Sequence, residues 1–359
     1  MHKHLHLAGS FNCVQHVVAE TQSALDQHSS VHIIAFSKDL FDFLRPLDNI
    51  GVKVEHADEI SYPRLFFPDT WIRCHREVRK FIKSRMTECR YDRVFAYGTG
   101  ISLAEMAAVG ILIRSKNLTL KPYDGFYEDS RFHTPAKGWK TKMFGKLISM
   151  ICGVPIEMMR PWAPVPMIKE RYLEENCAVI IKDREYDDHR NLKKSNCWEI
   201  LSTTSVVKVL WLYEDYIEYY GKERIDQSVF EAIWTDAVKI ISAFFPLEHQ
   251  AVKVHPGFTK SLPVCFSGME ELDRKIPIEF FDFPGVKLVV GISSLAMKKF
   301  IGKEGITVIG ILYLIGGDKL VVEEGEIILK AAINKNNEVS VVHSIDHFRQ
   351  CVETYLPLQ

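Results

Sequence analysis

Two stretches of the sequence, VKVHPGF at Val252–Phe258 and GISSLAM at Gly291–Met297, determine the fold expected of its second half. Each begins as a short apolar run typical of a buried β-strand and continues through a loop towards a helix. The first loop holds an imidazole, His255, and the second holds two adjacent hydroxyls, Ser293 and Ser294. In a parallel sheet both loops open at the same edge, where ligands bind. An ionisable ring and two hydroxyls near a helix start therefore predict a phosphate site.

The alternation of strand and helix continues through the rest of the second half. The pattern predicts strands at Val206–Leu212, Ala251–Val254, Ile278–Phe280, Lys287–Val290 and Thr307–Leu314, and helices at Gln227–Phe244 and Ser344–Tyr355. A loop is predicted at Tyr213–Arg224, where Glu214, Asp215 and Glu218 lie among tyrosines. A further helix is predicted to run from the Ser293-Ser294 pair to Phe300.

The first half shows the same kind of repetition. Strands are predicted at His4–Leu7, Val31–Phe36, Val52–Glu55, Asp92–Tyr97 and Leu118–Leu120, and helices at Val14–Leu25, Lys38–Leu44, Thr70–Met86 and Ile101–Ile113. Alternating strands and helices favour a parallel, doubly wound sheet. Two such halves predict an α/β chain with two Rossmann-like domains that face each other across a cleft.

The composition excludes several classes of protein. The chain has 359 residues, which predicts about two domains of ordinary size. Its formal net charge of −1 gives no reason to expect nucleic acid as a partner. The sequence contains 8 cysteines without a CxxC motif or a metal-ligand spacing, which favours free thiols in a reducing compartment.

The apolar runs of the sequence bear on its location. The first ten residues lack the long apolar core of a signal peptide, and no apolar run is long enough to cross a bilayer. We therefore expect a cytoplasmic protein. The segment Lys137–Ile148 mixes lysines with large apolar side chains. It is interpreted either as a surface helix with a solvated lysine face or as a peripheral contact with the inner face of the cytoplasmic membrane.

Four short motifs follow one another along the chain. They are Asp124-Gly125, then His255-Pro256, then IPIEFF at Ile276–Phe281 with Pro277 and Glu279, and then Ser293-Ser294. In this order they resemble motifs of the bacterial sialyltransferases and polysialyltransferases of GT-B fold. Those enzymes share a [DE][DE]G motif, an HP motif, a Pro-x-Glu segment and an S-S/T motif. The resemblance covers about half of the chain, and no single motif would be informative alone.

The resemblance implies an organisation and an activity. It implies an acceptor-binding domain at 1–180, a linker region at 181–205, a nucleotide-sugar-binding domain at 206–340 and a C-terminal helix at 341–359. The implied enzyme is an inverting transferase that moves sialic acid, or a related nonulosonic acid, from its CMP donor. The implied acceptor is a hydroxyl of a bacterial surface glycan, such as capsule or lipooligosaccharide. No metal or other cofactor is expected, because the sequence shows no DxD motif.

Each motif residue has an implied role. Asp124 takes the proton of the acceptor hydroxyl as general base. His255 contacts the departing phosphate as general acid or hydrogen-bond donor, and Ser293 and Ser294 bind the phosphate oxygens. Glu279 accepts hydrogen bonds from the ribose or the cytosine amine. The remaining candidate binding residues are Pro256, Gly125, Gly9 and Asn12.

The base and the donor each have alternatives. The first acidic position of the [DE][DE]G motif is Tyr123 in this chain, so Glu128 and Asp129 remain alternative bases. A GT-B transferase that uses CMP-Kdo, a UDP-sugar or a polyol phosphate donor is a second hypothesis. A catalytically silent nucleotide-binding or glycan-binding protein of capsule assembly is a third.

Overall fold

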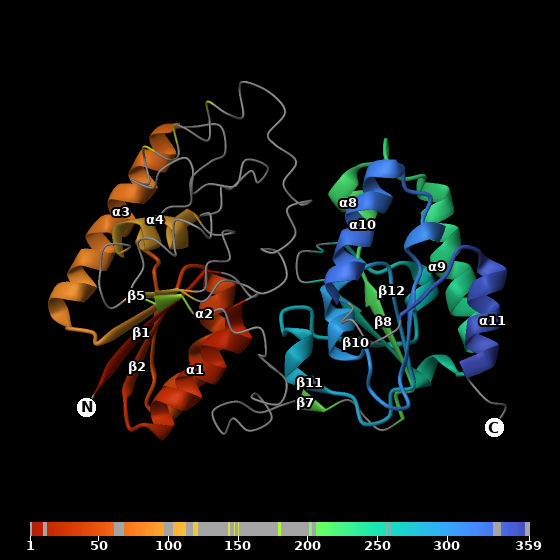
Figure 1. Cartoon of the computed structure of the whole chain (residues 1–359), viewed down its shortest axis with the longest axis horizontal. Helices are drawn as coiled ribbons and strands as arrows, with labels where there is room; N and C mark the ends of the chain where they lie inside the picture. Colours follow the sequence, from red (N-terminus) through yellow and green to blue (C-terminus); the bar gives the residue numbers. More distant parts are fainter. Residues whose placement is uncertain are drawn as a thin grey trace. The chain divides into compact units, whose positions relative to one another are not determined.

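The computed structural model divides the chain into two compact units, Met1–Glu199 and Ile200–Gln359 (Figure 1). The residues described are 2–9, 13–60, 68–96, 103–112, 118–120, 143, 147, 150, 179–180, 201–202, 206–255, 258, 260–332 and 339–355. The division falls within 181–205, the range predicted as the linker region, of which Leu201–Ser202 is described.

The first unit contains a six-stranded sheet with the spatial order β3-β2-β1-β4-β5-β6. Its strands are β1 (Lys3–Ala8), β2 (Ser30–Ala35), β3 (Lys53–His56), β4 (Arg93–Ala96), β5 (Leu118–Leu120) and β6 (Val179–Ile180). All neighbouring strands are parallel. After β3 the chain returns to the middle of the sheet, so the strand order reverses between β1 and β4, as in a Rossmann domain.

Helices cover both faces of this first sheet. They are α1 (Val14–Asp26), α2 (Lys38–Leu44), α3 (Pro68–Glu88) and α4 (Leu103–Leu112), with a 3-10 helix at Arg45–Ile50. Helices α3 and α4 lie together on one face, and α1 lies on the other (Figure 1). The face under α3 and α4 is apolar, since Leu5 and Leu7 of β1 pack there with Trp71, Val78 and Phe81 of α3.

The second unit repeats the same topology. Its main sheet has the order β10-β9-β8-β12-β13-β14, and all its neighbouring strands are parallel. The strands are β8 (Val209–Tyr213), β9 (Gln250–Val254), β10 (Glu270–Leu272), β12 (Leu288–Gly291), β13 (Thr307–Gly310) and β14 (Ser340–Val341). A separate two-stranded sheet pairs β7 (Leu201–Ser202) with β11 (Phe281–Asp282). Counted from β8, this is again the Rossmann order.

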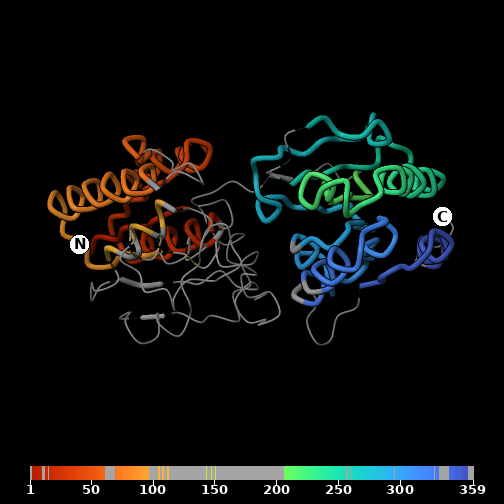
Figure 2. The backbone as a smooth tube through the Cα atoms, turned by 90° about the horizontal axis from the view of Figure 1, so that it is seen from above, coloured from red at the N-terminus to blue at the C-terminus, as the bar shows by residue number. Residues whose placement is uncertain are grey.

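The helices of the second unit enclose the sheet and its core. They are α8 (Tyr216–Tyr220), α9 (Gln227–Ser242), α10 (Lys319–Ala332) and α11 (Ile345–Tyr355). Both views place α9 and α10 on opposite sides of the sheet (Figures 1 and 2), and α11 packs against α9. The core is rich in aromatic rings, because Trp211, Tyr213 and Trp234 pack edge to face with Phe266. The predicted α/β fold class with two Rossmann-like domains, the organisation of GT-B proteins, is therefore confirmed.

Four predictions for the second unit are wrong in type. The range Tyr213–Arg224, predicted as a loop, contains the helix α8. Residues Ile278–Phe280 form a 3-10 helix rather than a strand, since Pro277 holds φ at −56° and the strand β11 begins only at Phe281. The helix expected after Ser294 is a short 3-10 helix, Leu295–Lys299. The apolar run after Thr307 leaves the sheet at Gly310 and continues as a 3-10 helix, Leu312–Leu314, whose Leu312 and Leu314 are buried.

Candidate functional site

The candidate site lies at the carboxyl edge of the second sheet, where the strand order reverses. Strand β8 lies between β9 and β12, with Tyr213 opposite Val254 and Leu212 opposite Gly291. His255 directly follows β9, and Ser293 lies two residues beyond Gly291, so both leave the sheet at the level of Glu214. Ligands of open α/β sheets bind at such a reversal point. The His255 motif and the serine motif thus follow the two strands that flank β8.

Gly291 permits the close approach of β8 and β12 at this edge. A Cβ atom at Gly291 would lie 3.2 Å from the Cβ of Leu212, which is tighter than ordinary contact. The next residues, Ile292 and Ser293, are fully buried, so the chain turns into the site without a solvent-exposed side chain. Glycine at the strand end therefore sets the position of both serines.

His255 is held by its backbone and by one tyrosine. Its N–H donates to the Tyr213 carbonyl at 3.1 Å, and its Nδ1 lies 2.6 Å from the hydroxyl of Tyr219. The pKa of His255 lies below its ordinary value, first because the protein displaces water from the ring and second because Lys253 is near. The ring is therefore neutral at neutral pH. When Tyr219 donates to Nδ1, the ring proton lies on Nε2, where it can be donated to a ligand.

The two serines have separate partners. The Ser293 side chain is fully buried and hydrogen-bonds the Tyr216 hydroxyl. The Ser294 hydroxyl accepts from the N–H of Ala296 at 3.3 Å, which caps the 3-10 helix Leu295–Lys299. Ser294 also hydrogen-bonds the carboxyl group of Glu214. The expected α-helix is absent from this position, so few peptide dipoles align here, and the hydroxyl groups themselves would be the main donors to an anion.

The backbone around Glu279 is held by Lys299, and the charge of Lys253 also acts on the Glu279 carboxyl group. The ammonium of Lys299, which follows the serines, donates to the carbonyls of Ile278, at 2.6 Å, and Phe281. Lys253, two residues before His255, donates to the carbonyls of Val254 and Arg274 at 3.0 and 3.1 Å. Burial raises the pKa of Glu279, and the two lysines oppose that shift. Lys299 thereby holds the Pro-x-Glu segment beside the segment that follows the serines.

The tyrosines of α8 are site residues that the sequence interpretation did not identify. Asp215 caps this helix, since its carboxylate accepts from the N–H of Glu218 at 3.1 Å, and Gly221 ends it with φ of 86°. Tyr216 and Tyr219, one turn apart, thereby point to Ser293 and His255 respectively. The signal was present in the sequence, because an acidic cap followed three residues later by glutamate and then by glycine predicts a short helix.

Of the other predicted site residues, only Gly9 lies among the described residues. Asp124, Gly125, Asn12 and Pro256 lie outside the described residues, as do the alternative bases Glu128 and Asp129. Gly9 directly follows β1 in the first unit, where a Cβ atom would overlap the carboxylate of Glu105 from α4. Glycine at position 9 is therefore required by packing at the reversal point of the first sheet.

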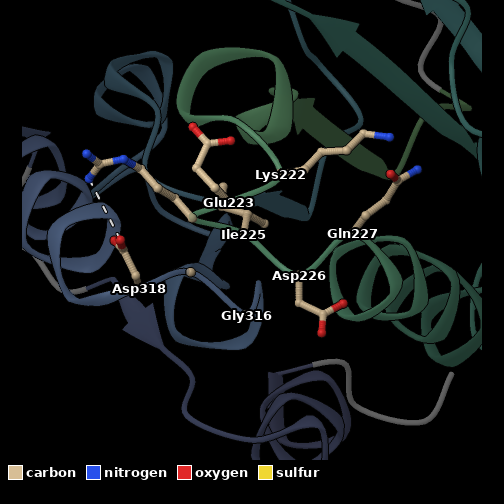
Figure 3. Close-up of a pocket in the computed structure, with 9 residues that line it drawn as sticks. Lys222, Glu223, Ile225, Asp226, Gln227, Gly316 and Asp318 are labelled. Carbon is tan, nitrogen blue, oxygen red and sulfur yellow. Dashed lines mark ion pairs between the residues drawn. The ribbon is translucent and has the colours of Figure 1, made fainter.

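A separate pocket of about 480 Å³ lies between the loop after α8 and the loop before α10 (Figure 3). Two of its acidic residues cap the helices that begin at these loops. Asp226 caps α9 through the N–H groups of Ser228 and Val229 at 2.9 and 3.2 Å, and Asp318 accepts from Val321 of α10 at 3.0 Å. Figure 3 shows Lys222 and Asp226 pointing in different directions, so they do not converge on one point. None of the predicted site residues lines this pocket.

Within the described ranges, no group of three or more His, Cys, Asp or Glu side chains is placed to hold a metal ion. Among the described helices, none has both the length and the apolar character needed to cross a membrane. Of the segment 137–148, only Met143 and Leu147 are described. Among the described cysteines, 74, 89, 265 and 351 are free thiols.

Comparison with known proteins finds similarity only among solved structures. No family model and no curated protein matches the chain. The glycotransferase of kitacinnamycin is 9% identical, with a TM-score of 0.48 over 98% of this chain and 90% of that one. MurG of Acinetobacter baumannii is 8% identical, with a TM-score of 0.41 over 99% and 90%. The glycosyltransferase SsfS6 of Streptomyces sp. SF2575, complexed with thymidine diphosphate, is 9% identical, with a TM-score of 0.39 over 99% and 100%.

Proposed function

We propose that the chain is an inverting glycosyltransferase that needs no metal and moves sialic acid, or a related nonulosonic acid, from its CMP donor to a glycan hydroxyl. The observation that supports it best is the placement of His255, Ser293 and Ser294 around the end of β8. His255 follows β9 and the two serines follow β12, on the two sides of the end of β8, and Glu279 lies near Lys253 and Lys299. This is the arrangement that a nucleoside monophosphate ester requires.

The proposed reaction is a single displacement. The acceptor hydroxyl attacks the anomeric carbon, and Asp124 takes the hydroxyl proton as the new C–O bond forms. The bond between the anomeric carbon and the phosphate oxygen breaks, and its electron pair leaves with CMP. His255 donates a hydrogen bond from Nε2 to that phosphate, while Ser293 and Ser294 donate to its other oxygens. One displacement without a covalent intermediate inverts the anomeric configuration.

A donor screen tests this proposal. The purified chain is incubated with CMP-sialic acid, CMP-Kdo, UDP-sugars and TDP-sugars, and the release of free nucleotide is measured with and without glycan acceptors. We expect release of CMP from CMP-sialic acid above the rates with the other donors. Release of UDP or TDP instead would show a transferase with another donor. Binding of CMP without any release would favour a catalytically silent protein.

The base requires a separate test. Asp124→Ala should abolish transfer and leave CMP binding within about twofold of the wild type, because a general base does not hold the nucleotide. Glu128→Ala and Asp129→Ala are the matched acidic controls from the same segment. Near-normal transfer by Asp124→Ala would exclude Asp124 as the base, and a loss in one of the controls would identify its replacement.

A further inference from the structure

Glu214 occupies the centre of the candidate site. It directly follows β8, the strand between β9 and β12, and the adjacent loops carry His255 on one side and Ser293 and Ser294 on the other. Strands β9 and β12 are two strand spacings apart, about 10 Å. A ligand that contacts both His255 and the serines must therefore pass over the end of β8, and hence over Glu214.

The carboxyl group of Glu214 belongs to the same hydrogen-bond system as the serines. It is half-buried, and its side chain bonds the hydroxyl of Ser294. The charge of Glu214 also acts on the hydroxyl groups of Tyr216, Tyr219 and Tyr220 of α8. An acid is an unusual neighbour for hydroxyl groups that bind phosphate, since an ionised carboxylate repels an anion.

The cations that approach this edge are engaged elsewhere. Lys260 pairs with Asp215 at 3.3 Å and lies 3.9 Å from Glu218. Lys253 donates to two backbone carbonyls, and burial is the largest of the causes that lower its pKa to about 8. Neither lysine is placed to neutralise Glu214 directly, whereas a second phosphate group would need such a cation.

We propose that Glu214 is a specificity-determining residue, which admits a donor with one phosphate group and discriminates against a nucleoside diphosphate. This inference rests on the proposed nucleotide site. With one phosphate over the end of β8, the hydroxyls of the serines and the His255 ring donate to the phosphate oxygens, and the Glu214 carboxylate lies at the same strand end. With two phosphates, the additional negative charge meets the Glu214 carboxylate, and of the described residues near this edge, Lys253 and Lys260 are engaged with other groups.

The protonation behaviour of Glu214 supports this assignment. Burial raises the pKa of Glu214 to about 7, and its bond to Ser294 opposes the shift. The carboxyl group is therefore largely ionised at pH 8, where the two nucleotides are compared. Above pH 7 the free site is negatively charged, which increases the penalty for each extra charge on the ligand.

The test compares CMP with CDP, which have the same base and differ by one phosphate. Dissociation constants are measured by calorimetry at pH 8, where the last proton has left each nucleotide. The wild type should bind CDP at least about tenfold more weakly than CMP. Repulsion between two unit negative charges about 8 Å apart, at an effective dielectric constant of about 20, lowers the affinity roughly thirtyfold. Glu214→Gln, which keeps the shape and can still bond Ser294, should bring the two constants to within about threefold.

Glu218→Gln is the matched control, because Glu218 is an exposed acid on α8 and should leave the CMP-to-CDP ratio at the wild-type value. Glu214→Ser is a second neutral variant, which should also narrow the ratio and is used if Glu214→Gln does not fold. An unchanged ratio in a folded neutral variant that still binds CMP would overturn the inference and leave the proposed function standing. Equal binding of CMP and CDP by the wild type would also overturn it. Binding of neither nucleotide would overturn the proposed function and the inference together.

Discussion

At the scale of single residues, the tyrosines of α8 decide which atoms of the site face a ligand. The hydroxyl of Tyr219 lies 2.6 Å from Nδ1 of His255, and the Tyr216 hydroxyl bonds Ser293. A neutral imidazole has one donor and one acceptor nitrogen, so a partner at Nδ1 determines what Nε2 can do. The orientation of His255 therefore depends on a residue outside the HP motif.

Removal of one hydroxyl group tests this dependence. Tyr219→Phe keeps the ring and loses the bond to Nδ1, so we expect CMP binding to weaken by about threefold to tenfold, the effect of one hydrogen bond. The pH profile of turnover should also shift, because the His255 ring loses a tautomer-specific partner. Tyr220→Phe is the control, since the Tyr220 hydroxyl faces Glu324. Equal effects of the two substitutions on binding and pH profile would contradict the role of Tyr219.

At the scale of elements, Lys299 joins the segment Ile278–Phe280 to the 3-10 helix after the serines. Its ammonium donates to the carbonyls of Ile278 and Phe281, which a three-residue helix cannot satisfy internally. Loss of this lysine should leave buried carbonyls without their donor and free the Glu279 backbone.

Lys299→Ala is expected to lower the free energy of unfolding of the second unit by about 1.5–3 kcal/mol, the usual range for hydrogen bonds to a charged group. CMP binding should weaken as well, because Glu279 moves. Urea unfolding followed by tryptophan fluorescence measures the first effect. The adjacent Lys298 is exposed, so Lys298→Ala should stay within about 0.5 kcal/mol of the wild type. Similar losses in both variants would refute a special role for Lys299.

The sequence predicted most strands of both sheets, because their apolar runs are short, continuous and bounded by turn residues. It predicted β9 and β12 and therefore brought His255 and the serines to one edge. It did not predict α10, because Gly325 interrupts the helical pattern and the preceding Gly316-Gly317 resembles a loop. The 3-10 helices were missed because a buried apolar turn has the same pattern as a buried strand. The role of Glu214 needs the order of the strands in space, which periodicity does not contain.

At the scale of the whole molecule, the first unit contains a buried network that makes stability depend on pH. His32 of β2 bonds Glu55 through Nε2 at 2.9 Å and the Tyr91 hydroxyl through Nδ1 at 2.6 Å. Arg85 of α3 donates to the other oxygen of Glu55 at 2.7 Å. Burial, followed by the charge of Lys53, lowers the pKa of His32 from 6.5 to about 4.

The sign of the effect follows from these pKa values. Because the unfolded chain binds the His32 proton near pH 6.5 and the folded unit only near pH 4, stability is lost as the pH falls between them. The loss is about 3 kcal/mol. Denaturant unfolding of the full chain at pH 7 and pH 4.5 measures it. His32→Gln should reduce the dependence, whereas His28→Asn, at an exposed residue with φ of 56°, should preserve it. If the free energy of unfolding of His32→Gln depended on pH as strongly as that of the wild type, His32 would not be the source of the effect.

The central claim is that the end of β8 binds a nucleoside monophosphate, and thermal unfolding of the wild type with CMP or UDP tests it most directly. A ligand at one hundred times its dissociation constant adds about 2.7 kcal/mol of stability, which raises Tm by several degrees for a unit of this size. We predict this shift for CMP, a clearly smaller one for UDP, and the loss of the CMP shift in the double variant Ser293→Ala, Ser294→Ala. Equal shifts with both nucleotides, or a CMP shift that survives in the double variant, would contradict the claim.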